Sequence, residues 1–275
     1  MGLAPGVTPA IALEQLGCAF PPPAGETTPY VALRDLNLTV AAGEFLAVVG
    51  PTGCGKSTIL NLTAGLLRPT AGTVRIFGEF LAGLNRRAGY LFQTDPLMPW
   101  RTAVQNVAIG LEYRGVDRAE ARRQAAEWLE RVGLAGRDHV YPDQLSGGMK
   151  KRVSLAQTLI LDPEIILMDE PFSALDVQTR LLMEDELLQI WARNRKSVLF
   201  ITHDLEEAIL LADRVVVRAA GPGTHAIGEF AIDLPRPRAV AELRYDPRFV
   251  DLHQQIWQVM KDEVLKGYAQ SKARA

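Results

Sequence analysis

A glycine-rich run at residues 50–58 has the residue types and the spacing of a loop that wraps around phosphate groups. It reads Gly-Pro-Thr-Gly-Cys-Gly-Lys-Ser-Thr and fits the pattern G-x-x-x-x-G-K-[ST] in full. Glycines let backbone N–H groups approach phosphate oxygens, because side chains there would block the approach. We expect Lys56 to neutralise the β- and γ-phosphates and the Ser57 hydroxyl to hold Mg²⁺. The residues predicted to bind nucleotide here are Gly50, Pro51, Thr52, Gly53, Cys54, Gly55, Lys56, Ser57 and Thr58.

Two adjacent carboxylates, Asp169 and Glu170, close an apolar run at 165–168 that is typical of a buried strand. A carboxylate at a strand end can accept a hydrogen bond from a magnesium-bound water, and its neighbour can take a proton from an attacking water. Phosphoryl transfer mainly requires the protein to position that water and to offset charge, so one well-placed base matters. An acidic strand end could also be merely solvated; the phosphate loop favours the chemical role.

Ser146, Gly147 and Gly148 form the start of a predicted helix and a second candidate anion site. A serine cap followed by two glycines exposes free N–H groups at the helix N-terminus. One phosphate loop holds one triphosphate, so the second site calls for another source of phosphate.

The order of these motifs resembles the ATP-binding cassette of ABC transporters. The resemblance implies that Ser146, Gly147 and Gly148 bind the γ-phosphate of ATP held by a second copy. Two cassettes would then face head to tail, with each ATP between one phosphate loop and the other chain's signature. Met149 stands where the usual signature has Gln, and this departure leaves the serine and glycine groups intact. The resemblance also implies that Asp169 orients Mg²⁺ and that Glu170 is the general base.

The same resemblance gives roles to residues that would be unremarkable alone. Gln93 would ligate Mg²⁺ through its amide oxygen, although an isolated glutamine is more often a surface hydrogen-bonding residue. His203, which ends the apolar run at 198–201, matches the switch histidine that contacts the γ-phosphate, whereas a lone histidine is usually structural. Residues 173–176 match the loop that crosses the dimer seam.

The sequence constrains two assignments less closely: the residue that stacks on adenine and the role of the cysteine in the loop. The family stacks adenine on an aromatic residue that precedes the phosphate loop; Phe20 fits this place, with residues 21–29 as an insertion, and Tyr30 is the alternative. We interpret Cys54 as a small filler and not as a catalytic thiol. We nevertheless expect a maleimide to react with Cys54 and inhibit, because a helix N-terminus and Lys56 would promote the thiolate.

Alternating strand-like and helix-like segments from about residue 10 to 218 favour an α/β sheet with crossover helices. Segment 73–77 alternates between apolar and polar residues and predicts an antiparallel strand. With the resemblance, the expected fold class is α/β: a P-loop NTPase (RecA-like) core with an antiparallel β subdomain and an inserted all-helical signature subdomain. Other predicted elements are buried strands at 44–49, 165–168, 198–201 and 215–217, a helix at 57–67, and helices capped by Thr102 and Asp117.

We predict two regions of the chain. Residues 10–234 form the cassette, whose helical subdomain spans about 95–160, and residues 235–275 form a C-terminal amphipathic helical extension. The dipeptide at 246–247 predicts the start of the last helix. Its apolar stripe suits packing on its own domain, with a dimer or regulatory contact as the alternative; the stripe consists of Phe249, Leu252, Ile256, Val259 and Met260.

Composition narrows the class of protein. A formal net charge of −2 over 275 residues argues against a nucleic-acid binder driven by bulk electrostatics. No apolar run approaches the ~20 residues of a membrane span, and residues 1–12 contain no Lys or Arg, so a secretory signal is not expected. Cys18 and Cys54 make no disulfide framework. We expect a peripheral protein at the cytoplasmic face of the inner (plasma) membrane.

Short strings at 98–102 and 234–238, with the Met-ended signature, are similar to the nitrate, sulfonate and taurine importer subfamily. We therefore expect an ATP-hydrolysing energy-coupling subunit of an importer for such a small anion, with ATP and Mg²⁺ as cofactors. The expected partners are a second cassette in the ATP-bound state, transmembrane permease subunits and, indirectly, a solute-binding protein, with no nucleic acid. The segment after Gln93 should receive a helix of the permease; Trp100 could instead be core of the helical subdomain.

The alternative is a soluble ABC-type ATPase that is not coupled to transport. It would predict two cassettes in one chain, a long coiled-coil insertion or a basic face, and the sequence has one phosphate loop and balanced charge. A non-hydrolysing nucleotide-binding module would be expected to lose Glu170 or His203, and both are present.

Overall fold

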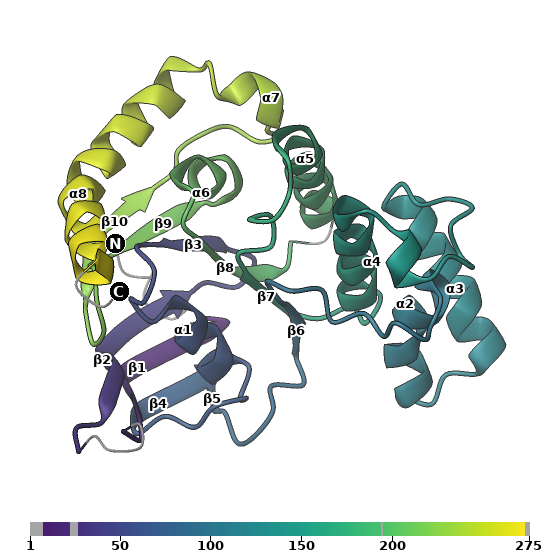
Figure 1. Ribbon diagram of the computed structural model, residues 1–275, viewed down its shortest axis with the longest axis horizontal. Coiled ribbons are helices and arrows are strands. Elements are labelled where there is room, and N and C mark those ends of the chain that lie inside the picture. The colour runs from purple at the N-terminus through teal and green to yellow at the C-terminus, as the bar shows by residue number, and fades with distance from the viewer. Residues whose placement is uncertain (1–7, 23–26, 194, 273–275) are drawn as a thin grey trace.

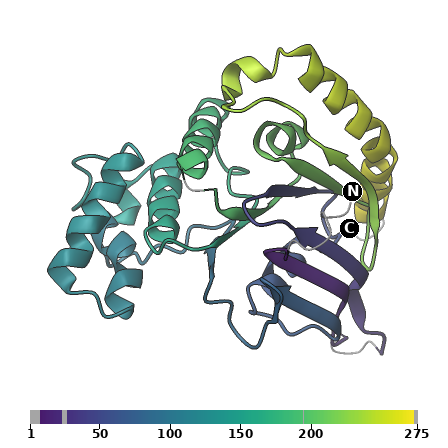
Figure 2. The ribbon, with the colours of Figure 1, turned by 180° about the vertical axis from the view of Figure 1, so that it is seen from behind.

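The computed structural model describes residues 8–22, 27–193 and 195–272. Within them the chain forms two sheets and a helical lobe that extends from the β6 edge of the larger sheet (Figure 1). Viewed from behind, the antiparallel sheet and the helical lobe again lie at opposite ends (Figure 2). Of the insertion predicted at 21–29, residues 23–26 lie outside the described residues.

The larger sheet has six strands in the order β10-β9-β3-β8-β7-β6. All its pairings are parallel except that of β10 with β9. The predicted buried strands are confirmed, and β3 and β8 are buried along their whole length, which explains why they read as nearly continuous apolar runs. The strands are β3 (Phe45–Val49), β6 (Ala88–Leu91), β7 (Ile165–Asp169), β8 (Ser197–Thr202), β9 (Arg214–Arg218) and β10 (Ala226–Ala231).

The smaller sheet is antiparallel and has the order β2-β1-β4-β5. Residues 73–76 of the alternating segment predicted at 73–77 fall in β4, which pairs antiparallel with β1 as expected, and Phe77 lies just beyond the strand. Apolar side chains of this sheet, of helix α1 and of one face of the larger sheet share one core. The elements are β1 (Ile11–Phe20), β2 (Tyr30–Val40), β4 (Ala71–Ile76), β5 (Glu79–Phe80) and α1 (Lys56–Thr63).

Helix α1 ends at Thr63, earlier than the predicted end at residue 67. Gly65 follows in the left-handed region with φ +73°, and a Cβ atom there would lie 1.9 Å from the Gly83 carbonyl oxygen. The chain must therefore leave the helix at this close backbone approach.

The helical lobe fills the region predicted at about 95–160. Asp117 caps α3 by accepting from the N–H groups of Ala119 and Glu120, and the Gln105 side chain accepts from the Thr102 N–H at the start of α2. The lobe has a core of its own, whose side chains come mainly from α2, α3 and α4. Its elements are α2 (Ala103–Tyr113), α3 (Arg118–Arg131), the 3₁₀ turn η1 (Pro142–Gln144) and α4 (Gly147–Leu159).

The opposite face of the larger sheet is covered by α5 (Val177–Arg193), α6 (Leu205–Leu211) and the C-terminal helices α7 (Val240–Leu243) and α8 (Pro247–Lys272). Asp246 accepts from the Arg248 N–H at the start of α8. The apolar stripe of α8 packs on its own chain, against α6, β9 and β10. No helix among the described residues combines the length and the apolar character that crossing a membrane requires.

Candidate nucleotide site

The glycine-rich loop leaves the buried end of β3 at the carboxyl edge of the sheet, where ligands of open α/β sheets bind. Gly53 and Gly55 have φ values of +84° and +87°. A Cβ atom at Gly55 would meet Leu33 at 2.7 Å, whereas one at Gly53 would meet nothing within 4 Å. Gly55 is thus required by packing and conformation, while Gly53 keeps the outer side of the loop open to a ligand.

Lys56 begins α1 and is folded back into the loop. Its Nζ donates to the carbonyl oxygens of Gly50 at 2.7 Å and Pro51 at 3.1 Å, and it lies 3.8 Å from Oε1 of Glu170. The side chain is buried, so this positive charge acts with little screening on an anion placed in the loop.

Ser57 and Asp169 come together although they are far apart in the sequence. Ser57 Oγ donates to Asp169 Oδ1 at 3.1 Å. Burial raises the pKa of Asp169, and the charge of Glu170 adds to the rise, while the bond from Ser57 opposes it. The negative charge of Asp169 is therefore not fully compensated by its neighbours. A hydroxyl oxygen beside such a carboxylate offers ligand atoms that suit Mg²⁺, which prefers oxygen ligands and keeps several waters.

Gln93 lies just past β6, and its residue is exposed. No hydrogen bond between described residues joins its side chain to Ser57 or Asp169, so the structure brings two of the three predicted metal ligands together. The Gln93 carbonyl oxygen, in contrast, accepts from Lys151 Nζ at 3.1 Å.

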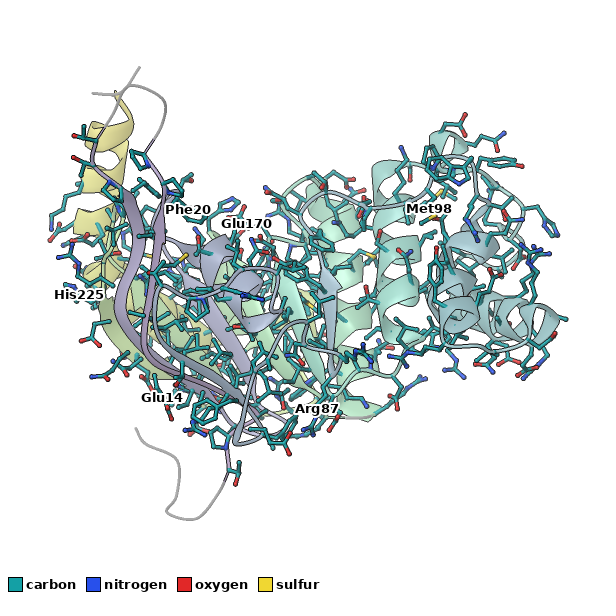
Figure 3. All side chains as sticks on the ribbon, turned by 90° about the horizontal axis from the view of Figure 1, so that it is seen from below. Glu14, Phe20, Arg87, Met98, Glu170 and His225 are labelled. Carbon is teal, nitrogen blue, oxygen red and sulfur yellow. The ribbon has the colours of Figure 1, made fainter. Side chains whose placement is uncertain are left out.

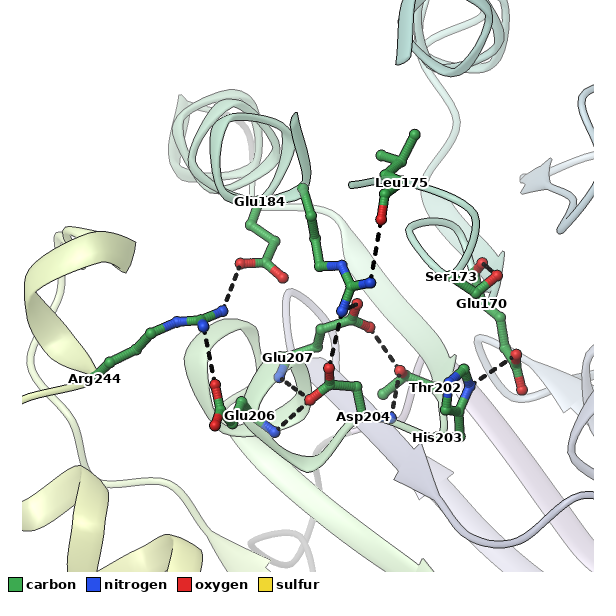
Figure 4. A network of polar contacts seen from close by, with 11 residues as sticks. Glu170, Ser173, Leu175, Glu184, Thr202, His203, Asp204, Glu206, Glu207 and Arg244 are labelled. Atoms are coloured by element: carbon green, nitrogen blue, oxygen red, sulfur yellow. Dashed lines mark hydrogen bonds and ion pairs between the residues drawn. The ribbon is translucent and has the colours of Figure 1, made fainter. Parts of the chain in front are cut away.

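Glu170 turns sharply out of β7. Its φ is +44°, an unusual value for a residue with a side chain, and its N–H donates to the Ile201 carbonyl oxygen at 2.8 Å. Its own carbonyl oxygen accepts from Ser173 Oγ at 3.0 Å. His203 Nδ1 lies 2.9 Å from Oε2 of Glu170 (Figure 4). The carboxylate is therefore held between a lysine and a histidine.

The residues on either side of His203, Thr202 at the end of β8 and Asp204 before α6, belong to a polar network (Figure 4). Thr202 Oγ1 donates to Glu207 Oε2 at 2.6 Å and accepts from the Asp204 N–H at 3.0 Å. Asp204 caps α6 and accepts from Arg180 Nη1 at 3.1 Å. Sequence reasoning missed this support, although Asp204 and Glu207 have the spacing of a capping box, which was a usable signal.

Arg180 extends the same network to the loop at 173–176. Its second terminal nitrogen, Nη2, donates to the Leu175 carbonyl oxygen at 3.3 Å. The loop that is predicted to cross a dimer seam and the loop that carries His203 are thus joined by one guanidinium group. An arginine can do this because its donors point in fixed directions from one plane.

Ser146 caps α4, and its Oγ accepts from the Met149 N–H at 3.3 Å. A Cβ atom at Gly147 would meet nothing within 4 Å, whereas one at Gly148 would lie 2.5 Å from Thr179 Cγ2. Gly147 is exposed. Helices α1 and α4 lie apart in both ribbon views, so one chain does not bring its predicted signature to its own phosphate loop (Figures 1 and 2).

The two adenine-platform candidates are neighbours. Phe20 pairs with Tyr30 across β1 and β2, and their ring centroids are 6.4 Å apart. Phe20 and Glu170 lie along the same side of the molecule in Figure 3, with Glu14 and Arg87 on the opposite side. Phe20 is partly buried and Tyr30 is 38% exposed, so both rings have a free surface and the platform stays a prediction.

Cys54 points away from the loop's open side. Its exposed fraction is 0%, and its Sγ lies 3.0 Å from where a Cβ atom of Gly50 would stand. The filler interpretation agrees with this packing. The expectation that a maleimide would react with the folded protein at Cys54 disagrees with it, because the thiol is out of reach.

A mainly apolar groove lies between β6, the segment that follows it, α2 and α4. Trp100, in the same segment, is 71% exposed, so the alternative that it is core of the helical lobe is wrong. The residues that line the groove include Tyr90, Phe92, Pro96, Ile109, Ser154 and Leu161.

Comparisons with known proteins agree with this geometry. A family model described as ABC transporter matches residues 33–173. An uncharacterized ABC transporter ATP-binding protein of Methanocaldococcus jannaschii is 48% identical over 86% of either chain. The nitrate import ATP-binding protein NrtD of Synechococcus elongatus is 44% identical over 86% of either chain. The taurine import ATP-binding protein TauB of Yersinia pestis is 41% identical, over 80% of this chain and 87% of its own.

Two solved structures are similar to the whole arrangement. They are dimers of the ATP-binding cassette MJ0796, one of them in a post-hydrolysis state with ADP and Pi bound. Each has a TM-score of 0.72 and covers 82% of this chain and 100% of its own, at 30% and 31% identity. The predicted fold, a P-loop NTPase core with its antiparallel and helical subdomains, is confirmed.

Proposed function

Because the chain belongs to the family of ABC transporter ATP-binding cassettes, we propose that it is the energy-coupling ATPase of an importer for nitrate, taurine, a sulfonate or a similar small anion. The observation that supports this best is the position of Glu170, between Lys56 at 3.8 Å and His203 at 2.9 Å. The relatives named for nitrate and taurine import favour a small anion of this kind as the solute.

The phosphate loop binds the triphosphate of ATP. Backbone N–H groups of the loop at 50–58, except at Pro51, which has none, surround the phosphates, and α1 points its positive dipole end at them. Lys56 Nζ moves from its carbonyl acceptors to the β- and γ-phosphates, whose negative charge is the better partner. Phe20 or Tyr30 stacks on the adenine ring.

Ser57, Asp169 and Gln93 would hold Mg²⁺, and the pair of Ser57 and Asp169 is already in contact. When bound, the ion would neutralise charge on the phosphates and orient them. Asp169 would bind through a water, and Gln93 would complete the set when its exposed side chain turns toward the loop.

Glu170 acts as the general base. Its carboxylate accepts a proton from water as the water oxygen bonds to the γ-phosphorus and the bond to the β–γ bridging oxygen breaks, which leaves ADP and phosphate. His203 holds the carboxylate in position and contacts the γ-phosphate. The network of Thr202, Asp204 and Arg180 keeps His203 in place.

A second copy of the chain completes the site. Ser146, Gly147 and Gly148 of one copy bind the γ-phosphate held by the other, since one copy keeps these two segments apart. The dimeric cassettes among the similar structures support this arrangement. The groove beside Phe92 and Pro96 receives a helix of the permease, which holds the cassette at the cytoplasmic face of the membrane.

Uptake measurements test the transport proposal. Cells that lack this chain are complemented with the wild type or with Glu170→Gln, and uptake of labelled nitrate, taurine and an alkanesulfonate is followed. We expect uptake of one of these anions to be lost in the deletion, restored by the wild type and not restored by Glu170→Gln. Unchanged uptake of all three in the deletion contradicts the anion-importer proposal.

A further inference from the structure

Lys151 is a buried lysine on α4, one turn beyond the start of the helix. The residue is 2% exposed. Its Nζ donates to the carbonyl oxygens of Phe92 at 3.2 Å and Gln93 at 3.1 Å, and it lies 2.9 Å from Asp95 Oδ1. Two of the three donors of the ammonium group thus have a carbonyl acceptor, and the Asp95 carboxylate forms an ion pair with it. A buried ammonium is tolerated only when it is paired and hydrogen-bonded in this way.

All three partners of the ammonium group belong to the short segment that leaves β6. Two of them are main-chain carbonyls, so Lys151 fixes the backbone of Gln93 and leaves the exposed side-chain amide free to turn. The Asp95 carboxylate offsets the positive charge. The contact therefore sets where the Gln93 side chain starts from, without occupying the group that would bind metal.

The helix that carries Lys151 also carries two other parts of the proposed machinery. Ser146 and Gly147 stand at its start, and Ser154, three positions after Lys151, lines the groove. Positions three or four apart lie on one face of a helix. The lysine thus connects the segment of Gln93 to a rigid element that runs from the signature to the groove.

We propose that Lys151 is a positioning residue that ties Gln93 to the signature helix, so that the Gln93 amide is presented to the metal ion at the phosphate loop. The inference rests on the proposed function, in which Gln93 is a metal ligand. Asp95 is the counter-ion that lets a lysine take this buried place.

The test measures metal binding separately from nucleotide binding. Lys151→Met keeps the length and removes the donors. The probe is Mn²⁺, whose free fraction is followed by electron paramagnetic resonance with a bound non-hydrolysable ATP analogue. We expect Mn²⁺ to bind the variant about tenfold more weakly, as is typical when the support of a ligand is lost. Affinity for ATP in the presence of a chelator should stay within about twofold, because the phosphate loop is untouched.

Lys150→Met is the matched control. Lys150 is the neighbouring lysine on α4, is only partly buried, and makes no side-chain hydrogen bond or ion pair with another described residue. We expect its Mn²⁺ affinity to equal that of the wild type. An equal loss of Mn²⁺ affinity in Lys150→Met and Lys151→Met would mean that the effect comes from removing any positive charge near the start of α4, and it would overturn the proposal.

Asp95→Asn serves if Lys151→Met does not fold. It keeps an oxygen acceptor but removes the counter-charge, so we expect weaker Mn²⁺ binding in the same direction. Unchanged Mn²⁺ affinity in a folded Lys151→Met, or in Asp95→Asn where that variant alone folds, overturns the role of Lys151. Absence of nucleotide-dependent Mn²⁺ binding in the wild type would instead contradict the proposed function.

Discussion

His203 and Glu170 lie 33 positions apart in the sequence, and their side chains meet at 2.9 Å between Nδ1 and Oε2. The other carboxylate oxygen of Glu170 faces Lys56 Nζ at 3.8 Å. The group proposed as base thus has a cation on the phosphate side and an imidazole on the other. This arrangement holds the carboxylate between two anchors and leaves it close to the phosphate loop.

Removal of the base is expected to separate binding from turnover. Glu170→Gln keeps the shape of the side chain but cannot take a proton, so kcat should fall by about 10²–10⁴-fold while the Kd for ATP stays near the wild-type value. Steady-state phosphate release and equilibrium binding of a fluorescent ATP analogue measure the two quantities. Turnover close to that of the wild type would remove Glu170 from the proposed role.

Lys56→Ala is expected to act on binding. The variant lacks the charge opposite the β- and γ-phosphates, and the Kd for ATP should rise by at least about tenfold. Titration with the same fluorescent analogue measures the change. Thr52→Ala is a suitable control, because Thr52 is exposed in the same loop and the loop binds through its backbone. Equal weakening in both variants would argue against a specific role for the lysine.

The two cysteine thiols should react poorly with thiol reagents in the folded protein. Cys54 and Cys18 are both buried free cysteines, and burial raises the pKa of the Cys18 thiol. A thiol reagent of the disulfide type should therefore react slowly with the folded chain and quickly with both thiols when the chain is unfolded in urea. Cys54→Ser should keep most ATPase activity. A fast native reaction that disappears in Cys54→Ser would show that the loop opens far enough to expose this side chain.

Stability should depend on pH through a buried pair of carboxyl groups. Burial raises the pKa of Glu184 to about 8 and that of Glu207 to about 7; the charge of Glu207 adds to the rise at Glu184, and the charge of Asp204 adds to the rise at Glu207. The positive charges of Arg244 and Arg180 oppose the rise of the Glu184 pKa, and Arg180 also opposes that of the Glu207 pKa. Between pH 4.5 and about 8 the folded state therefore holds protons that the unfolded state releases, so the free energy of unfolding falls as the pH rises. Each such proton contributes a slope of about 1.4 kcal/mol per pH unit.

Glu184→Gln should flatten this dependence. The neutral amide removes one titrating group, so the variant should gain stability relative to the wild type between pH 5 and pH 8, as measured by urea unfolding at each pH. Glu130→Gln is the control, because Glu130 is exposed on α3. A constant difference between Glu184→Gln and the wild type over this range would contradict the buried-carboxyl account.

The sequence was sufficient for the fold class and for where the site motifs lie along the chain. The phosphate loop and the carboxylates at 169–170 each follow a continuous apolar run, and such runs report buried strands directly. Spacing along the chain was enough because these groups sit at strand ends, which meet at one edge of the sheet.

Long-range side-chain partners could not be predicted in this way. Lys151 and Arg180 look like ordinary helix residues, and their roles depend on carbonyl groups that only the folded chain brings near them. The end of α1 was also predicted wrongly, because the sequence around Gly65 does not show that its backbone approaches Gly83 closely. The choice between Phe20 and Tyr30 stays open since the strands place both rings together.

The mass of Glu170→Gln in solution with ATP, followed by light scattering, shows whether two copies share each nucleotide site. We expect a monomer without nucleotide and a dimer with ATP, because each ATP binds one phosphate loop and the signature of the other copy. Adding Gly147→Asp should restore the monomer with ATP bound, since a side chain there meets nothing in its own chain and places a carboxylate against the partner's phosphate. A Glu170→Gln chain that stays monomeric at saturating ATP, or a dimer that Gly147→Asp leaves intact, would contradict the shared site.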